Sequence, residues 1–127
     1  MIEMDLRTFL LEQTAITTLI EARIYPEKLP QGAAKPALTY QRISGGEDVT
    51  HQGLGPARAL IQIGCWSERY EGALALAQTV RAALSGHRGA MGSSRYVTAM
   101  IVNAIDLPEP TIDLSCRALD VAINYEA

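Results

Sequence analysis

The sequence contains few of the residues that build metal and catalytic sites. Its 127 residues include only two cysteines and two histidines. Cys65 and Cys116 are far apart and belong to no CxxC pair, which argues against a structural zinc site. Each lies in an apolar segment, so we expect two buried, reduced thiols. His51 and His87 lie in glycine-rich segments without a partner for acid–base chemistry, and we therefore expect no metal, no cofactor and no enzymatic activity.

Basic residues and long apolar runs are also scarce. The formal net charge is −3 and the sequence pI is about 5.3. Proteins that grip duplex DNA usually carry a basic face, so this balance argues against such a module. No apolar run reaches the roughly 18 residues that a membrane span needs, and the first residues are acidic and do not resemble a signal peptide. Hydrophobic residues make up 48%, so we expect one domain over residues 1–127 that folds in a reducing cytoplasm.

Two stretches have the apolar spacing of helices. Residues 2–21 follow this spacing except at Gln13-Thr14, which predicts a kinked helix or two short helices. Asp5 is a candidate N-cap for the first of them. Residues 69–85 predict the clearest helix, and Gly86 can close it in a left-handed conformation. We expect its buried stripe to be Ala73, Leu76, Ala77, Val80 and Leu84.

Four stretches have the alternation of β-strands, namely residues 37–43, 57–67, 95–106 and 115–125. Residues 23–26 predict only a short extended piece, residues 44–56 a long polar loop, and residues 87–94 a flexible loop. The predicted fold class is α+β. We expect a four-stranded, mainly antiparallel sheet packed by an N-terminal helix or helix pair and one central helix, in the order α(α)ββαββ.

The basic side chains are mostly arginines, nine against two lysines. Arginine is favoured at interfaces because its planar fork makes paired hydrogen bonds and stacks on aromatic rings. Several arginines flank the predicted loops, where they either line a subunit contact or are merely solvated. We expect Asp120, inside an apolar strand, either to face solvent on the polar side of that strand or to form an ion pair with an arginine such as Arg58 or Arg117. The candidate residues for an interface between subunits or with another protein are Arg42, Glu47, Asp48, His51, Arg58, Arg88, Arg95 and Asp120.

An ordered set of segments then carries a family resemblance. The segments are ITTLI (16–20), RIYP (23–26), LPQGA (29–33), PALTY (36–40), ALIQIGCWS (59–67), ALALAQTVRAAL (73–84) and RALDVAINY (117–125). In this order the chain resembles the tail-completion or tail-terminator proteins of long-tailed bacteriophages, prophages and gene transfer agents. Residues 87–94 match no part of that pattern.

This resemblance implies a structural virion protein without a catalytic residue. The expected subunit assembles into a ring, with a hexamer expected, that caps the head-proximal end of the tail tube and ends its growth. Its implied partners are further copies of itself, the tail-tube protein and the head connector or stopper protein, with DNA only in transit through the channel. Two alternatives remain: another head–tail joining or head-completion protein, and a small ligand-binding α+β domain.

Overall fold

The computed structural model describes residues 2–44, 57–107 and 114–125. Three helices and six strands account for most of them. In chain order they are α1 (Ile2–Leu11), α2 (Thr14–Ile20), β1 (Ile24–Pro26), β2 (Ala37–Ser44), β3 (Ala57–Ser67), α3 (Tyr70–Leu84), β4 (His87–Met91), β5 (Ser94–Leu107) and β6 (Ser115–Tyr125).

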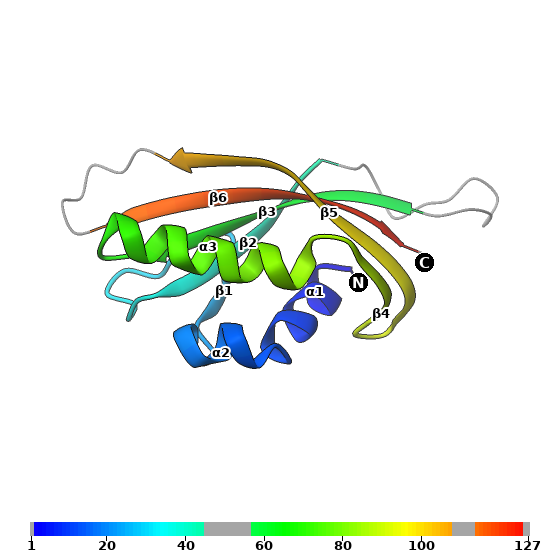
Figure 1. The fold of residues 1–127 in the computed structure, drawn as a ribbon, viewed down its shortest axis with the longest axis horizontal. Coiled ribbons are helices and arrows are strands. Elements are labelled where there is room, and N and C mark those ends of the chain that lie inside the picture. Colours follow the sequence, from blue (N-terminus) through cyan, green and yellow to red (C-terminus); the bar gives the residue numbers. More distant parts are fainter. Residues whose placement is uncertain (1, 45–56, 108–113, 126–127) are drawn as a thin grey trace.

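The six strands form one sheet in the order β1-β2-β3-β6-β5-β4. β1 runs parallel to β2, and every other neighbouring pair is antiparallel. Figure 1 shows all three helices on one side of this sheet, which curls around them as a half-barrel. The core therefore lies between the helices and one face, which we call the helix face; the other is the outer face.

The expected fold is wrong in its strand number and order. The sheet has six strands in a mixed arrangement, and the chain order is αα ββ β α ββ β. The prediction lacks two strands. The sequence predicts only a short extended piece where β1 lies and a flexible loop where β4 lies. β1 has only three residues, and β4 contains Gly89 with φ 126° beside a register shift. Neither offers the alternation from which a strand is predicted.

The helices begin and end close to where the sequence places them. The interruption at Gln13-Thr14 separates α1 from α2, and Gln13 is the N-cap residue of α2. The buried side of α3 consists of the five residues of the predicted stripe. These apolar side chains face the helix face of the sheet and fill the core.

The sequence predicts Asp5 as the N-cap of the first helix, and this prediction is wrong. Asp5 instead joins α1 to the turn after β4. It is buried within the helix, and its Oδ1 accepts hydrogen bonds from the backbone N–H of Ser93 (3.0 Å) and from the Ser93 hydroxyl (2.8 Å). The turn brings Gly92, with φ 56°, against Asp5. A buried carboxylate needs such partners, so this contact fixes the β4–β5 hairpin against α1.

Candidate functional site

A row of four polar side chains crosses the outer face of the sheet. Gln41 Nε2 donates to Gln62 Oε1 (3.5 Å), and Gln62 Nε2 donates to Asp120 Oδ1 (3.2 Å). From the other side, Asn103 Nδ2 donates to Asp120 Oδ2 (3.4 Å). The row joins β2, β3, β6 and β5, so amide donors satisfy both oxygens of the Asp120 carboxylate.

This arrangement differs from the ion pair expected for Asp120. Arg117 lies three positions from Asp120 on β6, so the two side chains lie on opposite faces of the sheet. Arg58 lies on the same face as Asp120, but in the strand register it is opposite Asn124. Asp120 therefore belongs to a hydrogen-bonded polar row.

Two of the candidate arginines share a second row on the outer face. Arg88 on β4 is opposite Thr98, Thr98 is opposite Asn124, and Asn124 is opposite Arg58. Both arginines are exposed. The register thus places two cations on one side of the sheet, separated by two short polar side chains.

Exposed apolar side chains concentrate on β5. Eight large hydrophobic residues are exposed in the described part of the chain, and four of them belong to this strand. The fractional exposures are 47% for Tyr96, 60% for Met100, 53% for Val102 and 41% for Ile105. Exposed apolar side chains clustered on one element are typical of an interaction surface.

On the helix face, Arg117 is the centre of a polar cluster. Its Nε donates to Asp106 Oδ1 (2.5 Å) and its Nη2 to the Tyr70 hydroxyl (3.2 Å), while that hydroxyl donates to Asp106 Oδ2 (2.7 Å). The hydrogen bonds from Arg117 and Tyr70 lower the pKa of Asp106, and the bonds to Asp106 and Tyr70 raise the pKa of Arg117. The cluster ties α3 to β5 and β6.

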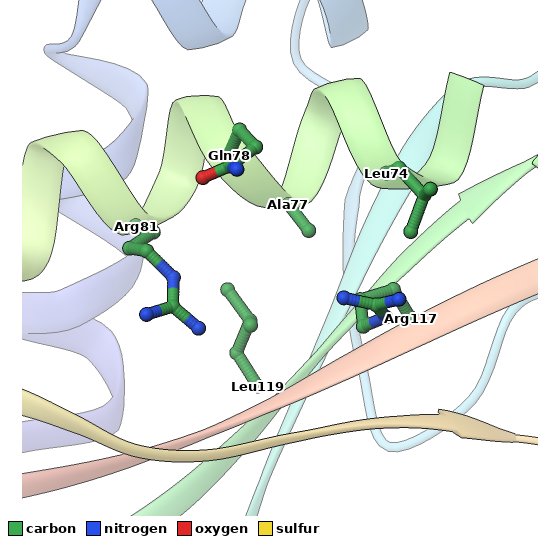
Figure 2. Close-up of a pocket in the computed structure, with 6 residues that line it drawn as sticks. All are labelled: Leu74, Ala77, Gln78, Arg81, Arg117 and Leu119. Carbon is green, nitrogen blue, oxygen red and sulfur yellow. The ribbon is translucent and has the colours of Figure 1, made fainter. Parts of the chain in front are cut away.

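A hollow of about 210 Å³ opens beside this cluster, between α3 and β6. Figure 2 shows Arg81 and Arg117 on either side of Leu119, with Leu74, Ala77 and Gln78 along the helix. Its lining mixes apolar and polar side chains, and guanidinium groups lie at its margins. It brings together no nucleophile and base, so it offers no catalytic constellation.

Arg42 lies at the opposite end of the sheet and on the helix face. Its Nε donates to Glu3 Oε2 (3.0 Å) and its Nη2 to the Tyr125 hydroxyl (3.4 Å). Glu3 Oε1 is buried and has no hydrogen-bond partner among the described residues. A second hollow, of about 420 Å³, is lined by Glu3, Met4, Pro26, Glu27, Tyr40, Gln41 and Arg42.

The structure thus separates the candidate interface residues. Arg58, Arg88 and Asp120 lie on the outer face, whereas Arg42 lies on the helix face. Arg95 belongs to β5. Glu47, Asp48 and His51 lie outside the described residues.

Sequence reasoning did not single out the exposed apolar residues of β5 or the Asp106–Tyr70 pair. Strand alternation could have found Met100, because it lies between the apolar residues Ala99 and Ile101 and must face the other side. The cluster around Arg117 depends on contacts between distant elements, and the sequence offers no local signal for these.

Three further observations concern the described residues. Within them, no group of three or more His, Cys, Asp or Glu side chains could hold a metal ion. In the same part of the chain, every helix is too short or too polar to cross a membrane. Cys65 and Cys116 are both buried, and neither forms a disulfide.

Comparisons with known proteins give a family and a fold. The family model described as "Tail completion protein gp17" matches residues 4–126. A chain in the solved structure "Virion of native gene transfer agent (GTA) particle" has a similar fold, with a TM-score of 0.69 and 17% sequence identity. The alignment covers 99% of this chain and 92% of that one. No curated protein sequence matches the chain.

Proposed function

The chain belongs to the tail completion protein gp17 family, and on this premise we propose that it forms a hexameric ring at the head-proximal end of a phage-like tail tube. It is a structural component of a phage-like virion and associates there with other tail or head proteins. In this proposal the ring ends growth of the tube and joins it to the head connector. DNA passes through its channel.

The observation that carries the proposal is the family match over nearly the whole chain. A chain of the same fold occurs in a gene transfer agent virion, which supports a virion role for this architecture. The net charge of −3 also agrees with a channel through which DNA slides without being gripped. We propose a single domain without enzymatic activity.

We also propose that the candidate residues contribute to contacts within the ring or with the tube. The row formed by Arg58 and Arg88 supports this best, because both guanidinium groups are exposed on one face. Charge reversal of both, R58E/R88E, should reduce assembly. The matched control R69E reverses the charge of an exposed arginine that lies outside this row, at the start of α3.

Removal of the gene from a strain that produces the particles tests the function. We expect tails without heads, with tubes of uncontrolled length, beside heads filled with DNA, as counted by negative-stain microscopy. Wild-type protein and R69E should restore complete particles, and R58E/R88E should restore fewer. Tails of normal length beside heads that lose DNA would assign the protein to head completion. Normal particles in the deletion strain would refute both functions.

A further inference from the structure

Strand β5 extends beyond the strand that covers its outer edge. On one side it pairs with β6 over residues 97–107, but on the other side β4 pairs with it only over residues 94–99. Among the described strands none pairs with that second side over residues 100–107, which we call the open edge of β5. Figure 1 shows this half of β5 running along the border of the sheet, past the end of β4.

One hydrogen bond shows which backbone groups point outward along this edge. The Ala99 carbonyl accepts from the backbone N–H of Gly86 (3.1 Å), so Ala99 directs its backbone groups away from β6. Residues whose side chains lie on the same face as that of Ala99 also direct their backbone groups away from β6, because side-chain and backbone directions alternate together along a strand. Beyond the register shift, these residues are Ala104 and Asp106, opposite Leu119 and Arg117 of β6.

The composition of the open edge favours pairing with another strand. The segment MIVNAIDL contains no Lys, Arg or Pro, the residues that commonly protect an edge strand. Its one charged side chain, Asp106, is bound by Arg117. Met100, Val102 and Ile105 are all exposed. Unpaired N–H and C=O groups beside exposed apolar side chains form a template for strand addition.

The other border of the sheet has a shorter open edge. Among the described strands only β1 borders this side of β2, and because it pairs only with residues 38–40, β2 continues past it over residues 41–44. Leu38 and Tyr40 direct their backbone groups toward β1, and alternation gives Arg42 the same direction. Ile43 is 42% exposed. We call residues 41–44 the open edge of β2.

A vacant space adjoins the open edge of β2. The hollow of about 420 Å³ is lined there by Tyr40, Gln41 and Arg42. Glu3, from α1, also lines it, and its buried Oε1 has no donor among the described residues. A strand placed at this edge supplies backbone N–H donors, which suits an unpaired carboxylate oxygen.

The two open edges are complementary in direction when neighbouring copies are offset along the strands. β2, β3, β6 and β5 are joined by three antiparallel pairings, so β2 runs antiparallel to β5. Gln41 and Asn103 belong to one row across the sheet, so without an offset residues 104–107 of β5 would meet β1 beside residues 38–40 of β2. An offset of about four residues brings residues 104–107 opposite residues 41–44, and a ring closes with such an offset when its strands are tilted to the ring axis.

We propose that the open edge of β5 in one copy pairs antiparallel with the open edge of β2 in the next copy. The inference rests on the proposed ring and identifies the contact that repeats around it. The sheet then continues across each boundary between copies, and the exposed Ile43 of one copy lies near the exposed Ile105 of the next.

Disulfide cross-linking tests this placement. In the double variant I43C/I105C, the new thiols lie on facing strands at the proposed boundary, within reach of a disulfide. Mild oxidation should give a ladder of covalent multimers of this chain on a denaturing gel. The matched control L19C/I43C places the second thiol on α2, at a side chain that is 37% exposed, and should stay monomeric. The native cysteines are buried and should not compete for oxidation.

A backbone substitution tests the hydrogen bonding. A104P removes one outward N–H, whereas the control A15P places proline in the first turn of α2, where it is tolerated. A104P should lower ring formation by about tenfold, measured by sedimentation and negative-stain microscopy, with A15P close to wild type. If A104P does not fold, I105K adds a charge at the same edge on a side chain that is 41% exposed, and it should have the same effect.

The outcomes separate the two proposals. If wild-type protein forms rings but I43C/I105C gives no multimers and I105K assembles normally, the edge pairing is wrong and the ring stands. If I105C cross-links to a different tail protein, the pairing between copies is again wrong. If wild-type protein forms no ring in solution or on tails, both proposals fail.

Discussion

Alanine at Gly64 should damage the fold, because the space for its methyl group is already occupied. A Cβ at this position would lie 2.6 Å from Thr39 Oγ1 and 2.7 Å from Trp66 Nε1. Those two atoms form a hydrogen bond of 2.9 Å, in which Trp66 donates to Thr39. The methyl group would therefore enter this hydrogen bond on the outer face between β2 and β3.

The magnitude follows from three contributions. Loss of the hydrogen bond costs about 1 kcal/mol. Overpacking costs about 1–3 kcal/mol, and Thr39 has little freedom to move because it is only 6% exposed. Replacing glycine by alanine within a strand by itself stabilises the fold by about 0.5–1 kcal/mol, because glycine loses more conformational freedom on folding. The free energy of unfolding should therefore fall by about 1–3 kcal/mol.

The assay uses Trp66, the single tryptophan of the chain. Urea titration of G64A, followed by its fluorescence, should show a lower midpoint with an unchanged slope. The folded-state emission should shift to longer wavelength, because displacing the half-buried indole exposes it to more water.

A double-mutant cycle with T39A supplies the control. T39A removes both the acceptor and one of the two clashing atoms, so alanine at 64 should cost less in that background. If G64A leaves stability and emission unchanged, or if the two effects simply add, the reasoning is refuted.

Three further predictions follow from single residues. G92A should destabilise the fold by about 1–3 kcal/mol more than G32A, because both have positive φ but only Gly92 meets Asp5; urea titration of both variants measures the difference. The pKa of Asp106 is lowered in the folded state, so its ionised form stabilises the fold above its ordinary pKa of about 4, and this contribution is lost as pH falls through the lower folded pKa; D106N should flatten the acid limb of the stability curve. Burial raises the pKa of the Cys65 thiol, so a thiol reagent at pH 8 should modify it only after unfolding; modification of the native protein at a rate independent of urea would contradict this.

The helices and the four longer strands could be predicted because their signals are local. The α3 stripe and the alternation in β3 each repeat over more than ten residues, so one buried side is evident from the sequence. β1 and β4 lack such a signal. β1 forms because Arg23 and Glu27 exchange backbone hydrogen bonds with β2. β4 is held partly by the contact of His87 with the Phe9 ring at 4.7 Å, which joins elements far apart in the chain.

The side-chain contacts of the site could also be predicted only in part from local signals. Periodicity could assign Arg117 and Asp120 to opposite faces, because three positions separate them on one strand. It could not show which side chains lie opposite them, because this depends on the register between strands. Asp120 therefore meets Gln62 and Asn103, and Arg117 meets Asp106.

The outer face and the open edges make different demands on a partner. The polar row satisfies its own hydrogen bonds within the subunit, so covering this row with protein gains little and a free subunit can leave it in water. The open edge of β5 instead has outward backbone groups beside Val102 and Ile105, and both kinds of group gain from a partner strand. Strand pairing also fixes direction and register, which a flat polar face does not. The specificity of the contact between copies should therefore reside in the edges, and the outer face stays available for the contact proposed for Arg58 and Arg88.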